Sequence, residues 1–209
     1  MLQRFKNSFI KPPRLAKVAF PYLVWRIPNN ENKIYLTFDD GPIPGNTEWI
    51  LKTLRFYNIK ATFFCVGDNV RKYPHLFKKI IEEGHAVGNH TFNHLSGWNT
   101  LGSTYMTNVN LASTYVKTKL FRPPYGKVRV SLCRKLSKNY KIIMWDVLSL
   151  DYDQTISGKE CFDNVMSNTS TGSIIVFHDN IKAKKNLYEA LPMCIEHLLM
   201  QGYTFDVVD

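Results

Sequence analysis

The sequence contains a pair of carboxylates and a pair of imidazoles whose spacing could support metal chemistry. Asp39 and Asp40 are adjacent and directly follow an apolar run, where two carboxylates repel each other unless a cation or an arginine lies near them. His90 and His94 are four residues apart and would share one face if that segment is helical, so they could hold one metal ion. Two histidines and one carboxylate form a catalytic zinc ligand set with positions open for water and substrate. The same set also suits non-haem iron.

Three other polar residues are candidates because of where they stand in the chain. Arg122 opens a segment that two prolines stiffen, and it could pair with one of the tandem aspartates and keep it ionised. His178 follows the strongly apolar run 174–177. A histidine at such a position can act as a general acid if a carboxylate raises its pKa, and Asp151 is the candidate partner.

These residues need a scaffold that brings distant segments together, and the hydrophobic pattern predicts one. From Lys33 onward, short runs rich in Val, Ile, Phe, Tyr and Thr alternate with segments of helical spacing. The alternation favours a parallel sheet with helical crossovers, as a closed or nearly closed (β/α) barrel or, second, as an open doubly wound sheet. The predicted strands are 34–38, 61–65, 85–88, 120–121, 141–145, 173–177 and 204–208.

The candidate residues all follow the carboxyl ends of predicted strands. In a (β/α) barrel these ends meet at one mouth, where catalytic groups are found. Polar residues with a purely structural role would be scattered over both ends of the barrel. The sequence therefore predicts one active site at the carboxyl ends of the strands.

Composition fits one globular domain of 209 residues, with 44% apolar and 21% charged residues. No run of about 18 apolar residues occurs, so no transmembrane helix is predicted. The apolar stretch 18–25 near the basic N-terminus is interrupted by Pro21 and lacks a cleavage site after it, so we expect no signal peptide. We expect this stretch to pack on the main domain or to lie on a membrane surface, which favours a cytoplasmic or membrane-peripheral protein.

Charge gives a weaker indication about partners. Lys and Arg number 27 against 17 Asp and Glu, a net charge of +10, which favours contact with an anionic membrane or cell envelope. Basic and aromatic residues are scattered rather than arranged as a platform, so no nucleic-acid partner is predicted. The four cysteines have neither zinc-knuckle nor redox spacing, and no specific protein partner is implied.

From about Lys33 to the C-terminus, the motifs resemble those of the polysaccharide deacetylase family (carbohydrate esterase family 4, the NodB homology domain). Thr-Phe-Asp-Asp-Gly-Pro at 37–42, His-Thr-x-x-His at 90–94 and Arg-Pro-Pro-Tyr-Gly at 122–126 match the family's first three motifs. The fourth motif often reads Asp-Ser-x-Asp-Trp, and here Leu148 replaces its first carboxylate.

The resemblance implies a distorted (β/α)7 barrel with parallel strands, spanning 31–209, and a basic N-terminal extension, 1–30, packed on or near it. The implied activity is metal-dependent removal of N-acetyl groups from amino sugars of a chitin oligomer, peptidoglycan, exopolysaccharide or lipid-linked sugar. By motif, Asp40, His90 and His94 would bind the metal, most simply zinc. Asp39 would be the catalytic base, held in place by Arg122.

The resemblance also implies roles for residues of the later motifs. The backbone N–H of Tyr125 would help bind the oxyanion. His178 would be the catalytic acid, tuned by Asp151. Tyr152, where the family often has Trp, and Val176, where it often has Leu, would wall the pocket for the acetyl methyl group. These two replacements bear on the size of the acyl group.

Three other classes of function are consistent with parts of the sequence. A glycan-binding module with a degenerate site is consistent with the altered fourth motif. An amidohydrolase acting on a small cyclic amide would use the same ligands and the same acid and base. An iron oxygenase could use the two-histidine, one-carboxylate set, but its usual all-β scaffold fits the alternating pattern badly.

Overall fold

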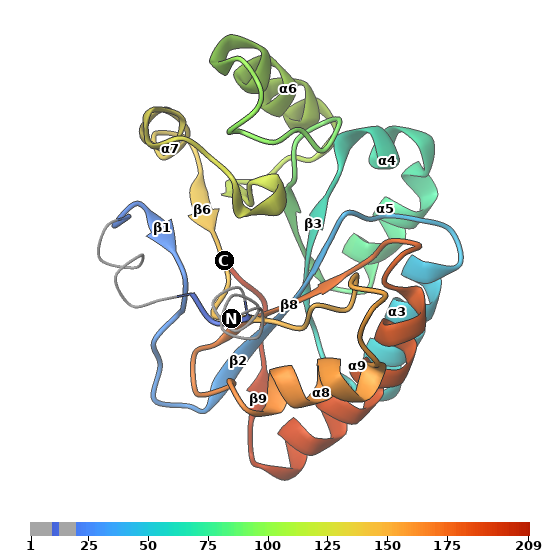
Figure 1. The fold of residues 1–209 in the computed structure, drawn as a ribbon. Helices are drawn as coiled ribbons and strands as arrows, with labels where there is room; N and C mark the ends of the chain where they lie inside the picture. The colour runs from blue at the N-terminus through green and yellow to red at the C-terminus, as the bar shows by residue number, and fades with distance from the viewer. Residues whose placement is uncertain (1–9, 13–19) are drawn as a thin grey trace.

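The computed structural model describes residues 10–12 and 20–209. Residues 1–9 and 13–19 of the predicted extension, with part of the apolar stretch 18–25, therefore lie outside the described residues. The described part forms a distorted (β/α)7 barrel, with strands in the centre and helices around them at the top, right and bottom of Figure 1. No helix in the described ranges is long and apolar enough to cross a membrane.

The strands are short and belong to one sheet. They are β1 (Leu23–Val24), β2 (Lys33–Asp39), β3 (Thr62–Cys65), β4 (Ala86–Asn89), β5 (Leu120–Phe121), β6 (Lys141–Ile143), β7 (Val147–Leu148), β8 (Ile174–His178) and β9 (Thr204–Phe205). Their order is β1-β6-β5-β4-β3-β2-β8-β7, with every pairing parallel, and β9 pairs with β2 beside this path. The two ends of the path, β1 and β7, do not pair with each other in the described part of the chain, so the barrel is incomplete there.

Helices follow most strands, as right-handed parallel crossovers require. They are α3 (Asn46–Phe56), α4 (Gly67–Lys72), α5 (Pro74–Glu82), α6 (Gly102–Tyr115), the 3₁₀ turn η1 (Pro124–Gly126), α7 (Val130–Leu136), α8 (Gly158–Met166) and α9 (Lys184–Met200). Local signals set several of their starts: α5 begins with a proline in its first turn, and Ser157 and Glu160 form a capping box for α8.

Side chains alternate along β2 as its pleat requires, and this alternation positions the site. Ile34, Leu36 and Phe38 pack in the main hydrophobic core under the helices. Thr37 and Asp39 point the other way, into the barrel, where both contact Arg122. A single strand therefore supplies apolar groups to the core and polar groups to the mouth.

The predicted strand 141–145 ends two residues early, as β6, and the unpredicted strand β7 begins at Val147; the reason lies in the backbone. Met144 donates its N–H to Val24 in β1, whereas Asp146 donates to Ile174 in β8, so the chain changes neighbours between these residues. The carbonyls of Ile143 and Met144 accept hydrogen bonds from Arg122 instead of from a strand. Strand β1, which lies within the predicted extension 1–30, and helix α4 were not predicted.

Candidate active site

Asp40, His90 and His94 lie together at the mouth of the barrel. Asp40 follows β2 with a positive φ of 84°, and His90 follows β4. Each of the three residues offers one ligand atom, and these atoms lie within 4.8 Å of one another. Asp40 Oδ1 is 3.0 Å from His94 Nε2 and 3.5 Å from His90 Nε2. The structure therefore brings the three predicted metal ligands together.

The segment that carries the histidines is a loop and not a helix, so the helical premise for their pairing is wrong. Strand β4 ends at Asn89, and positive φ values of 64° at Thr91 and 57° at His94 are incompatible with an α-helix. Asn89 holds the loop, since its side chain accepts the N–H of Thr91 and donates to the carbonyl of Val109. The two imidazoles approach each other because the loop after β4 turns back on itself. The spacing of residues in the sequence does not reveal such a turn.

Both imidazoles are oriented through their other ring nitrogen. His90 Nδ1 lies 2.8 Å from the backbone carbonyl of Arg122, which can only accept, so Nδ1 carries a proton and Nε2 is the ring nitrogen that faces Asp40. His94 Nδ1 lies 3.1 Å from the hydroxyl of Tyr125. Partners of this kind fix the tautomer and the ring orientation of metal-binding histidines.

The residues present fit a divalent metal ion. The buried Oδ1 of Asp40 has no hydrogen-bond partner among the described residues, and Oδ2 accepts a hydrogen bond of 2.6 Å from Asn180. Burial alone would raise the pKa of Asp40, but the imidazoles of His90 and His94 hold it well below its usual range. One carboxylate and two imidazoles, with one ligand atom each within 4.8 Å of the others, are a ligand set that zinc takes.

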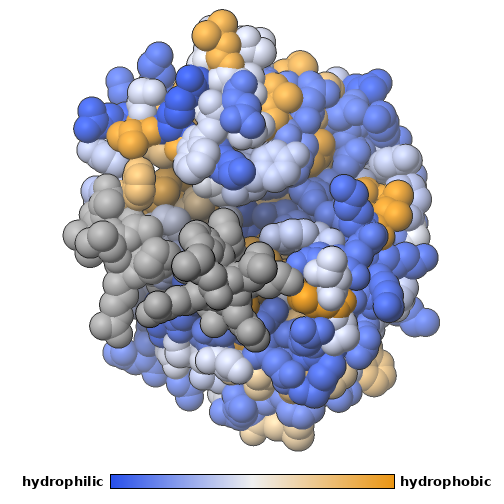
Figure 2. Space-filling model, in the orientation of Figure 1, coloured by the Kyte–Doolittle hydropathy of each residue, from blue (hydrophilic) through white to orange (hydrophobic). Residues whose placement is uncertain are grey.

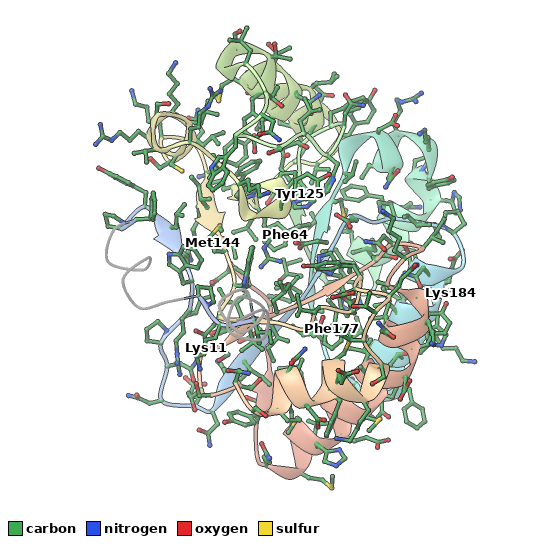
Figure 3. All side chains as sticks on the ribbon, viewed as in Figure 1. Lys11, Phe64, Tyr125, Met144, Phe177 and Lys184 are labelled. Carbon is green, nitrogen blue, oxygen red and sulfur yellow. The ribbon has the colours of Figure 1, made fainter. Side chains whose placement is uncertain are left out.

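Asp39 is held by a fully buried arginine. Arg122 Nη1 donates to Asp39 Oδ1 at 2.6 Å and to Thr37 Oγ1 at 2.8 Å, and its Nη2 donates to the carbonyl of Met144. The guanidinium lies 4.0 Å from the centre of the Phe64 ring, and Figure 3 shows Phe64 and Met144 near the centre of the molecule, below Tyr125. The two adjacent carboxylates therefore have different partners, Arg122 for Asp39 and the two histidines for Asp40, and these partners relieve the repulsion between them.

His178 and Asp151 form the second ion pair of the mouth. His178 is the last residue of β8 and pairs in register with Asp39 on β2, so the two side chains emerge side by side. Asp151 accepts hydrogen bonds of 2.7 Å from both Nδ1 and the backbone N–H of His178. Burial disfavours the imidazolium, but the Asp151 carboxylate outweighs it and raises the pKa of His178 to about 9.

The remaining predicted residues lie around this cluster. Tyr125 is on η1 with its side chain 61% exposed and its ring 4.6 Å from that of His94. The ring of Tyr152 stands edge-on to His178 at 4.8 Å. Val176, two residues before His178 on the same face of β8, is buried with Leu148. The roles of Tyr125, Tyr152 and Val176 in binding the oxyanion and the acetyl group stay predictions.

The structure also shows supporting residues that sequence reasoning missed. Asn180 and Asn69 hold Asp40 through its carboxylate and its backbone carbonyl. Asp179 is buried against Gly41 and accepts hydrogen bonds from Asn46 and Thr47, and burial raises its pKa to about 7. Asn180 could have been found from its place two residues after the end of β8. Nothing in the sequence pattern connects Asn69 or Asn46 to this site.

Comparison with known proteins agrees with the fold and with the motifs. The model of the polysaccharide deacetylase family matches residues 26–142. A peptidoglycan-N-acetylglucosamine deacetylase of Bacillus cereus is 35% identical over 194 residues, which cover 90% of this chain and 91% of that protein. The crystal structure of a peptidoglycan N-acetylglucosamine deacetylase superposes with a TM-score of 0.84 at 28% identity, over 94% of this chain and 95% of that one.

A third similarity bears on activity. A mutant of a pseudoenzyme from carbohydrate esterase family 4, with restored enzymatic activity, has a TM-score of 0.75 at 25% identity, over 89% of this chain and 69% of that one. Together these findings show that the chain belongs to the polysaccharide deacetylase family, a family of hydrolases of carbon–nitrogen amide bonds in N-acetylated sugars that also includes a pseudoenzyme.

Proposed function

We propose that this protein is a metal-dependent hydrolase that removes the N-acetyl group from N-acetylglucosamine residues of peptidoglycan. The observation that carries the proposal is the convergence of three units at one mouth: the ligand set of Asp40 and the two histidines, the Asp39–Arg122 pair, and the His178–Asp151 pair. The choice of glycan is supported by the similarity to the peptidoglycan-N-acetylglucosamine deacetylase of Bacillus cereus.

Asp40, His90 and His94 would hold the metal ion, most simply zinc. When bound, such an ion lowers the pKa of a water molecule and polarises a carbonyl group. Asp39 would accept the proton of the attacking water, because Arg122 fixes the orientation of its carboxylate through a contact of 2.6 Å. The backbone N–H of Tyr125 would donate to the oxyanion that develops on the acetamide.

His178 would supply the proton that the leaving amine needs. Its Nδ1 is occupied by Asp151, so Nε2 is the nitrogen available to the substrate. A pKa of about 9 keeps the imidazole protonated at neutral pH, as an acid in this step requires. The leaving nitrogen would depart as an amine and the acyl group as acetate, which balances the hydrolysis.

Membership of the family does not by itself establish turnover, because the family includes a pseudoenzyme. This chain has a candidate base, a candidate acid and three ligands, all in contact with the partners that orient them, which favours an enzyme over a glycan-binding module. The altered fourth motif does not remove any of these groups, since Asp151 is kept and pairs with His178.

The test measures acetate released from peptidoglycan glycan strands and from chitin oligomers. The protein is stripped with a chelator and then assayed before and after zinc is restored. We expect release only after zinc is restored, and a mass loss of one acetyl group per deacetylated sugar. Cyclic amides are included in the same panel, and ammonia is measured alongside acetate. Activity on these amides would distinguish an amidohydrolase from a glycan deacetylase. The absence of acetate release from both glycans by the zinc-loaded protein would overturn the proposal.

A further inference from the structure

A cavity of about 590 Å³ lies beside the proposed active site, at the start of α9. Its walls include Gln154, Lys182, Lys184, Lys185 and Asn186, and we call it the basic cavity. No acidic side chain lines it within the described part of the chain. Figure 3 places Lys184 toward the right-hand edge of the molecule, and Figure 2 shows that this side of the surface is mainly hydrophilic.

The walls of the basic cavity continue the two loops that carry the proposed acid and its partner. Lys182 is four residues after His178, and Gln154 is three residues after Asp151. Asn186 ties the two walls together, because its Nδ2 donates to the backbone carbonyls of Asp151 and Asp153, each at 3.1 Å. The cavity wall therefore contacts the loop of Asp151, the hydrogen-bond partner of His178.

The charges of the cavity are available to a ligand. Its three lysines are exposed and form no ion pair with any described residue. Lys184 lies 5.5 Å from the ring centre of Tyr188, a contact that leaves the charge uncompensated. Asn186, 2% exposed, is held in the wall by the hydrogen bonds of its Nδ2. The cavity thus offers three cations to a ligand.

We propose that the basic cavity binds a carboxylate of the glycan while the neighbouring acetamide occupies the active site. This inference rests on the proposed function. Peptidoglycan strands carry a carboxylate on the lactyl ether of muramic acid where no peptide is attached, and on the peptide stem where one is, whereas chitin carries none. The lysines would bind this carboxylate. The cavity would make the enzyme prefer peptidoglycan over neutral glycans.

The experiment compares three substrates: chitin oligomers, peptidoglycan strands from which the peptide has been removed, and peptide-bearing strands. The triple variant Lys182→Gln/Lys184→Gln/Lys185→Gln removes three charges from the cavity. The matched control, Lys117→Gln/Lys135→Gln/Lys138→Gln, removes three charges at the opposite end of the barrel, from the last turn of α7 and from the loops that lead into β5 and β6. The quantity measured is the ratio of kcat/KM on each anionic strand to kcat/KM on chitin oligomers.

We expect this ratio to fall about tenfold in the cavity variant, through KM, and to stay unchanged in the control. A fall already present on peptide-free strands assigns the carboxylate to the lactyl group, and a fall only on peptide-bearing strands assigns it to the stem. An unchanged ratio in the cavity variant, or an equal fall in the control, would overturn the proposal.

Failure of the proposed function gives a different result, namely no acetate release from any of the three substrates by the zinc-loaded wild type. Calorimetric titration of the same strands then still tests the cavity, because binding does not require turnover. Tighter binding of peptidoglycan strands by the wild type than by the cavity variant would support the inference. Equal affinities would refute it.

Discussion

The two carboxylates that leave β2 have the same chemistry and different partners, and this difference supports the roles proposed for them. Asp39 is bound by a permanently charged guanidinium, whereas Asp40 faces the Nε2 atoms of two imidazoles and has an oxygen without a hydrogen-bond partner among the described residues. A carboxylate that an arginine orients suits proton transfer, and one that faces imidazoles suits metal binding. The sequence alone does not show which of Asp39 and Asp40 has which proposed role, because the two are adjacent. Their contacts in the structure distinguish them.

The first prediction follows from that assignment. Asp39→Asn should keep the metal, because Asp40 and the histidines are untouched, and should lower kcat by about 10²–10⁴-fold, the usual contribution of a general base. Asp163→Asn, on the surface of α8, is the matched control and should leave kcat unchanged. Acetate release and zinc content are measured on the same samples. Near wild-type turnover by Asp39→Asn with zinc bound would refute the assignment of the base.

The second prediction concerns the pH profile. His178 is faced by Asp151 from the loop after β7 and by Asp39 and Asp40 from the end of β2. Its pKa is raised to about 9, so the acid is present below that pH and is lost as the pH rises through it. Asp151→Asn removes the nearest charge, and the alkaline limb of kcat/KM should then move toward the ordinary histidine value of about 6.5. An alkaline limb that does not move would show that His178 is not the acid.

At the scale of the elements, the predicted strands were largely correct because each is a buried run of apolar residues. The helical premise for residues 90–94 was wrong because the loop depends on Asn89 and on two positive φ values, which no hydrophobic period signals. The early end of the predicted strand 141–145 was also not predictable, since the guanidinium of Arg122, 21 and 22 residues earlier in the chain, takes the carbonyls of Ile143 and Met144. Long-range polar contacts of this kind leave no local pattern.

The third prediction tests the close contact between the turn after β2 and the turn after β8. A Cβ at Gly41 would lie 2.2 Å from Oδ2 of Asp179, which is itself fixed by hydrogen bonds from Asn46 and Thr47. Gly41→Ala should therefore lower the free energy of unfolding by about 1–3 kcal/mol, as overpacking does, and displace Asp40. Gly102→Ala, whose nearest neighbours would be 3.6 Å away, is the control. Chemical denaturation and metal affinity are the measurements.

At the scale of the whole molecule, the order of the strands explains why residues so distant in sequence meet. The neighbours β4-β3-β2-β8 place the ends of β4, β2 and β8 along one rim, and these ends carry His90, Asp39 with Asp40, and His178. The barrel topology was predictable from the alternation of strands and helices. The incomplete closure between β1 and β7 was not, because it depends on how residues 143–147 change neighbours.

The same topology makes the proposed metal ion a link between distant parts of the barrel, which gives the fourth prediction. Asp40 and the two histidines come from the ends of β2 and β4, and the unfolded chain does not hold them together. A ligand that binds only the native state stabilises it by about 2.7 kcal/mol at a free concentration of 100 times its Kd. For a chain of this length that corresponds to a rise in Tm of about 5–10 °C. Binding of zinc to the cysteines and histidines of the unfolded chain would reduce this rise.

Calorimetry of the stripped protein with and without zinc should show the rise in Tm. In His94→Ala the rise should be largely lost, whereas His197→Ala, which changes a histidine exposed on α9, should keep it. Equal rises in all three proteins would place zinc outside the Asp40, His90 and His94 cluster.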